Sequence, residues 1–155
     1  MVTGHKKTRT FRGCEPHDGA TMSKKPLVAL YGNPSFRGPI AIEVISANGT
    51  ENDSELTLCI ESDPQEGGFG SRTRSISPEE AARIWSLLDG IENDSAEGSV
   101  IGLDGTFFSL KIERSGEQAS FSWWGNSRSE WEDVGLLADK LLRLAGPDAA
   151  SLRRG

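Results

Sequence analysis

Residues 99 to 125 constrain the fold more than any other stretch, because apolar and polar side chains alternate along them between two turn signals. Alternation with a period of two is typical of a β-strand that buries one face. Asp104-Gly105 favours a two-residue type I′ turn, in which both turn residues need a positive φ, and Ser115-Gly116 is a second, weaker signal of this kind. The stretch therefore predicts a three-strand antiparallel meander.

Counting outward from the two turns predicts which residues face each other. Across the first turn, Leu103 is expected opposite Thr106 and Ile101 opposite Phe108. The residues that the two turns together place on one buried face are Ile101, Leu103, Thr106, Phe108, Leu110, Ile112, Ala119, Phe121 and Trp123. Agreement between two separately inferred turns favours this register.

Trp124 and Phe107 fall on the other face of the meander, directly opposite each other and among polar residues that include Lys111. Cross-strand aromatic pairs stabilise sheets, and the N-terminal half of the chain could also cover this face. Aromatic residues equally dominate the binding hot spots of protein interfaces. Phe107, Trp124 and Lys111 are therefore the candidate partner-binding residues, with a purely structural role as the competing interpretation.

The first half of the chain predicts strands followed by a helix. The apolar run 27–31 ends at Gly32-Asn33-Pro34 and is expected to be an edge strand. Residues 40–44 and 56–60 both alternate, which predicts an antiparallel hairpin with one face inward. The glycine-rich residues 63–70 predict a loop.

Two helices are expected, one after each group of strands. Ser77-Pro78-Glu79-Glu80 is a strong helix start, and this helix should run to about Asp89 and stop at Gly90. The second helix should open near Ser129 and stop at Gly146-Pro147. The order strands, helix, three-strand meander, helix predicts an α+β fold in which two helices pack on one face of an antiparallel sheet.

A chain of 155 residues suits one domain. We expect that domain to span residues 26–146 and the residues after it, 147–155, to form a flexible tail. Residues 1–25 lack periodicity and are expected to be a disordered leader, unless translation starts at Met22 rather than Met1.

The net charge of −6 is unevenly distributed. Residues 1–25 carry six basic and two acidic side chains, a net +4, which leaves −10 for the other 130 residues. An acidic body repels phosphate backbones, which argues against nucleic acid as a partner, and it suits a basic protein partner or simply solubility. No run of residues is apolar enough to predict a membrane span or a signal peptide. Cys14 and Cys59 do not suggest a disulfide framework. We therefore expect a cytoplasmic protein.

The residues that most enzymes rely on are sparse. His5 and His17, the two histidines, both lie in the expected leader, so neither a histidine-based catalytic pair nor a zinc site is expected in the body, and we expect no metal or cofactor. Clustered carboxylates between residues 51 and 66 are expected to be solvated loop charges. Arg72 and Arg74, beside the glycine-rich loop, form a candidate anion clamp, although a solvated strand edge explains them as well.

Three segments of the last third of the chain resemble small uncharacterised bacterial proteins. These segments are Leu103-Asp104-Gly105-Thr106, then Phe121-Ser122-Trp123-Trp124, then a leucine-rich helix led by Trp131. They are similar to the DGT hairpin, aromatic strand and terminal helix of that group. The resemblance implies a bacterial origin and supplies no activity or site.

These observations favour a non-enzymatic protein-binding domain, conceivably an acidic inhibitor or immunity-type protein for a basic toxin. The alternative is a carboxylate-dependent hydrolase or small-ligand-binding protein that uses Arg72 and Arg74 on an anion. A structural subunit that pairs through a sheet edge is a third hypothesis.

Overall fold

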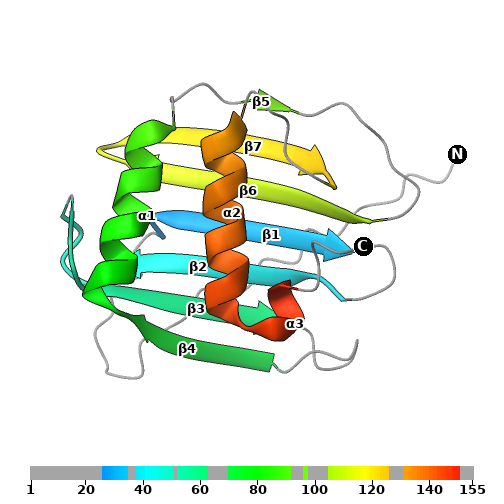
Figure 1. The fold of residues 1–155 in the computed structure, drawn as a ribbon, viewed down its shortest axis with the longest axis horizontal. Helices are drawn as coiled ribbons and strands as arrows, with labels where there is room; N and C mark the ends of the chain where they lie inside the picture. The colour runs from blue at the N-terminus through cyan, green and yellow to red at the C-terminus, as the bar shows by residue number, and fades with distance from the viewer. Residues whose placement is uncertain are drawn as a thin grey trace, which may run out of the picture.

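The computed structural model describes residues 26–34, 38–50, 52–62, 70–91, 96–97, 105–125 and 131–150. Its elements, in chain order, are β1 (Val28–Pro34), β2 (Ile40–Ser46), β3 (Leu56–Ser62), β4 (Gly70–Ile76), α1 (Pro78–Gly90), β5 (Ala96–Glu97), β6 (Thr106–Arg114), β7 (Glu117–Trp124), α2 (Glu132–Ala145) and α3 (Pro147–Ala150). The seven strands form one sheet in the order β4-β3-β2-β1-β6-β7-β5. The helices lie across one face of this sheet (Figure 1), which confirms the predicted α+β class.

The core lies between the helices and the sheet, as the strand alternation predicts. Six side chains that point from the sheet toward the helices are at most 1% exposed: Val28, Leu30, Ile42, Val44, Leu58 and Leu110. The apolar stripes of α1 and α2 close this layer from the other side, with Ile84, Leu137 and Leu141 fully buried. Burial of one face of each amphipathic element therefore holds the two layers together.

β1 is a central strand, so the prediction of an edge strand at 27–31 is wrong. It pairs antiparallel with β2 on one side and with β6 on the other. Its outward side also fits an interior position, because Ala29 is only 7% exposed. A nearly continuous apolar run is typical of a strand flanked on both edges, and this signal outweighs the turn residues that follow it.

The turn at Ser115-Gly116 is confirmed. Arg114 pairs with Glu117, and both turn residues have a positive φ, 50° at Ser115 and 78° at Gly116. β6 and β7 therefore keep the predicted register along their whole length, with Phe108 opposite Trp123 and Leu110 opposite Phe121.

The expected hairpin around Asp104-Gly105 is wrong. β6 has β7 on one edge and β1 on the other, where Thr106 pairs with Pro34 and Phe108 with Gly32. A strand has only two edges, and both edges of β6 are occupied by β1 and β7. The expected partners Leu103 and Ile101 lie outside the described residues. The strand that precedes β6 is β5, which pairs parallel with β7 at the far edge of the sheet.

The helix starts follow the sequence at α1 and differ at α2. The Ser77 hydroxyl accepts a hydrogen bond from the Glu80 backbone N–H at 3.2 Å, as the capping motif predicts. α1 includes Gly90, where a Cβ atom would lie 2.6 Å from Oδ2 of Asp133, so glycine here permits a close approach of α2. α2 begins after Trp131, which supplies no side-chain cap, and the expected cap Ser129 lies outside the described residues.

The tail expected from residue 147 onward begins instead with structured residues. Pro147–Ala150 form α3, and Ala149 is 2% exposed within the core. The proline that stops α2 also suits the first position of a new helix, so the Gly146-Pro147 pair separates two helices rather than ending the fold. Residues 1–25 and 151–155 lie outside the described part of the chain.

Asp53 organises the turn between β2 and β3. Its carboxylate accepts hydrogen bonds from the Ser46 hydroxyl at 2.7 Å and from the backbone N–H groups of Asn48 and Glu55, each at 2.9 Å. These bonds lower the pKa of Asp53 from 3.8 to about 2. The Trp85 indole also donates to the Asp53 backbone carbonyl at 2.8 Å, which ties the turn to α1.

We expect Asp53→Asn to lower the free energy of unfolding at neutral pH, because the ionised carboxylate accepts the hydrogen bonds from Ser46, Asn48 and Glu55. A lowered pKa means that this stabilisation is complete above 3.8 and is lost as the pH falls through about 2. Urea unfolding between neutral pH and about pH 2 should show this loss in the wild type and a flatter profile in the variant. Glu55→Gln is the matched control, and equal profiles for Asp53→Asn and the wild type would contradict this role.

Candidate functional site

The candidate site lies on the sheet face that points away from the helices, which we call the open face. The helices α1, α2 and α3 all lie on the other side (Figure 1). Strand alternation and register place six side chains of interest on the open face: Tyr31, Glu43, Glu61, Phe107, Lys111 and Trp124.

Phe107 and Trp124 form the predicted aromatic pair on this face. They are cross-strand partners, with ring centroids 6.3 Å apart and ring planes tilted by 46°. Phe107 is 38% exposed, and Trp124 is half-buried rather than part of the core. The predicted position of the pair depends only on the turn at 115–116, so the wrong prediction of a hairpin at 104–105 does not affect it.

Gly105 explains how the Trp124 indole fits at the end of the strand. A Cβ atom at Gly105 would lie 3.2 Å from Nε1 of Trp124, and the φ of Gly105 is +119°. Glycine tolerates both this backbone conformation and the close contact. The glycine of the DGT segment therefore leaves room for the indole of Trp124.

Lys111 lies on the open face but away from the aromatic pair. It is exposed and sits between Ser120 of β7 and Ala29 of β1. Four residues along β6 separate it from Phe107, a spacing of about 13 Å in a strand. The predicted face is therefore right, while Lys111 and the two aromatic residues form separate parts of it.

Sequence reasoning missed an acidic group near the centre of the open face, formed by Tyr31, Glu43 and Glu61. Burial raises the pKa of Glu43, and the nearby Glu61 raises it further. Burial also raises the pKa of Glu61, and burial together with both carboxylates raises that of Tyr31. Among the described residues, no ion pair joins either carboxylate to a cation.

The acidic group could not be assembled from the sequence because neither the partner of β1 nor the register of the β2–β3 hairpin was predicted. Glu43 alternates visibly with the buried Ile42 and Val44, so its outward direction could be found. Its proximity to Tyr31 follows only from the pairing of β1 with β2, and its proximity to Glu61 from the pairing of β2 with β3. Half-burial of two like charges is costly in isolation, and a cation from a partner would relieve it.

Arg72 and Arg74 belong to the other side of the sheet. They lie on the edge strand β4, opposite Ile60 and Leu58, and therefore point to the helical side. The Arg74 guanidinium donates to the Leu144 backbone carbonyl at 2.8 Å and lies 3.7 Å from the Glu80 carboxylate. Arg74 thus binds the C-terminal end of α2, where carbonyl groups lack helical partners. The loop 63–69 lies outside the described residues.

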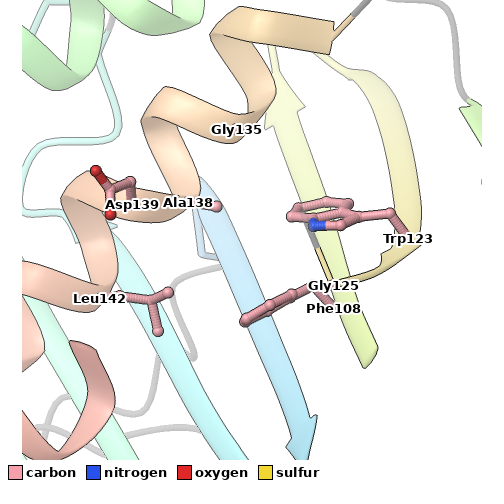
Figure 2. A pocket seen from close by; sticks show the side chains of 7 residues that line it. All are labelled: Phe108, Trp123, Gly125, Gly135, Ala138, Asp139 and Leu142. Atoms are coloured by element: carbon pink, nitrogen blue, oxygen red, sulfur yellow. The ribbon is translucent and has the colours of Figure 1, made fainter. Parts of the chain in front are cut away.

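The cavity between α2 and the β6–β7 hairpin is too small for a substrate. Figure 2 shows Phe108 and Trp123 projecting toward α2, where Gly135 and Ala138 face them. The cavity holds about 10 Å³, roughly one water molecule. The described ranges also contain no group of three or more His, Cys, Asp or Glu residues placed to hold a metal ion.

Comparisons with known protein families, curated proteins and solved structures found no match for this chain. None of the helices in the described residues is both long and apolar enough to cross a membrane.

Phe107 and Phe108 provide a matched test of the two faces, because they are neighbours that point in opposite directions. Phe107 is 38% exposed and Phe108 is 2% exposed. We expect Phe107→Ser to cost about 1 kcal/mol of unfolding free energy and Phe108→Ser at least about 3 kcal/mol. Urea denaturation of the two variants measures the difference, and losses of similar size would show that the open face is part of the packed core.

Proposed function

We propose that this chain is a protein-binding domain whose open face docks a basic protein. The observation that carries the proposal is the exposed Phe107, packed against Trp124 on the same face as the carboxylates of Glu43 and Glu61. Binding hot spots are typically rich in large aromatic side chains. Charged groups beside them determine which partner binds.

The charge of the face favours a basic partner. β2, β3 and β6 place the carboxylates of Glu43, Glu61 and Glu113 on it, against the ammonium group of Lys111. The 130 residues after the basic leader carry −10. Such a field attracts a cationic partner and speeds its encounter with the face. A lysine or arginine from that partner would also pair with the two half-buried carboxylates.

An acidic inhibitor or immunity-type protein for a basic toxin is the class that fits these properties best. It acts by covering its target, so it needs an exposed surface and no catalytic group. The alternative of a carboxylate-dependent enzyme would need converging acidic groups in a pocket. Asp139 is the one acidic residue among the lining of the cavity of about 10 Å³ and of the groove of about 270 Å³ between the helices, so neither brings carboxylates together. A cytoplasmic location and a bacterial origin stay predictions.

The test is capture of a partner by the immobilised full chain, followed by identification, purification and measurement of its affinity. We expect a basic protein whose affinity falls with rising salt and falls roughly thirtyfold for Phe107→Ser or Trp124→Ser. Glu43→Gln with Glu61→Gln should weaken binding and reduce its salt dependence. Leu136→Ser is the matched control, because it removes another exposed large apolar side chain, this one from the helical side.

Three results would overturn the proposal. The protein whose retention depends on Phe107 could carry a negative net charge, Leu136→Ser could weaken the binding of that protein as much as Phe107→Ser, or the wild type could retain no protein beyond what Phe107→Ser retains. Melting curves of each variant show whether a loss of binding reflects a loss of fold.

A further inference from the structure

The helical side of the molecule carries a second exposed apolar side chain, Leu136, which is 47% exposed. It borders a groove of about 270 Å³ between α1 and α2. Leu87, half-buried on α1, lies in the same groove. Leu87 and Leu136 are the two large apolar residues among the groove's lining.

The rim of this groove is cationic, although the chain as a whole carries −6. Arg83 lies on α1, and Lys140 and Arg143 on α2, with Asp139 as the acidic residue among the groove's lining. The Arg143 guanidinium lies 3.2 Å from the Asp139 carboxylate, so that pair is satisfied within α2. Among the described residues, no ion pair joins Arg83 or Lys140 to a carboxylate.

The size and shape of the groove favour a protein segment over a small molecule. Pockets for drug-sized ligands enclose roughly 300–1,000 Å³ and bury most of the ligand, whereas this groove is smaller and open to solvent. A groove between two helices whose lining combines leucines with cations suits an amphipathic helix laid along it.

We propose that the groove between α1 and α2 binds an acidic amphipathic helix of a partner protein. Leucine-like side chains of that helix pack on Leu87 and Leu136, and its carboxylates pair with Arg83 and Lys140. The proposal uses none of the residues of the open face, so it stands or falls independently of the proposed function. It implies that the domain can hold two partners of opposite charge, one on each side of the sheet.

The test uses two synthetic helical peptides with the same leucine stripe, one flanked by glutamates and the other by lysines. Fluorescence anisotropy of the labelled peptides, titrated with the full chain, should show saturable binding of the glutamate peptide alone. Leu136→Ser should weaken that binding about tenfold, and Arg83→Glu with Lys140→Glu should abolish it. Phe107→Ser on the open face is the matched control and should leave it unchanged.

Equal binding of the two peptides, no saturable binding of the glutamate peptide, or equal losses for Leu136→Ser and Phe107→Ser would overturn the proposal. Sedimentation velocity adds one further outcome. If the chain self-associates and both Leu136→Ser and Phe107→Ser abolish the association, the occupant of the groove is the acidic open face of a second copy, and a partner helix is refuted.

Discussion

The backbone pairing of β1 with both β2 and β6 is the interaction on which the rest of the structure depends. β1 uses both of its edges, with Leu30 opposite Ile42 on one side and opposite Leu110 on the other. This pairing joins the strands before α1 and the strands before α2 into one sheet. Both helices then cover the same apolar face of this sheet, each after its own group of strands. Among the described residues, no helix lies on the opposite face.

Side-chain contacts reinforce this layering at the ends of the elements. The Arg114 guanidinium lies 5.4 Å from the centre of the Trp85 ring and forms an ion pair with Asp89 at 2.8 Å, which fastens the tip of the β6–β7 hairpin to α1. The same Trp85 donates to Asp53 in the β2–β3 turn. One indole therefore connects α1 to turns from both halves of the sheet.

Local patterns predicted the features that depend on neighbours close in sequence. The turn at Ser115-Gly116 set the register of β6 and β7, and that register alone placed Phe107 beside Trp124. The capping motif at Ser77 likewise needs only the next turn of helix. These features could be read from the sequence because a positive φ, a side-chain cap and a period of two are properties of a few consecutive residues.

The choice of neighbouring strand could not be predicted in this way. Alternation specifies the face on which a side chain lies, but any antiparallel strand with the same alternation satisfies the free edge of β6. The Asp104-Gly105 signal favoured a local partner, and the apolar β1 occupies that edge instead. The acidic group of Tyr31, Glu43 and Glu61 follows from the pairing of β1 with β2 and the register of β2 against β3, so it became visible only in the assembled sheet.

Native-state hydrogen exchange of the β1 amides tests the central position of this strand most directly. If β1 is bonded on both edges, its amides from Val28 to Gly32 exchange only with global unfolding, as slowly as those of β6, while amides of the edge strand β4 exchange faster. Exchange of the β1 amides at the rate of β4, with β6 still protected, would show that another segment fills the edge of β6, and the account of the open face would fail with it.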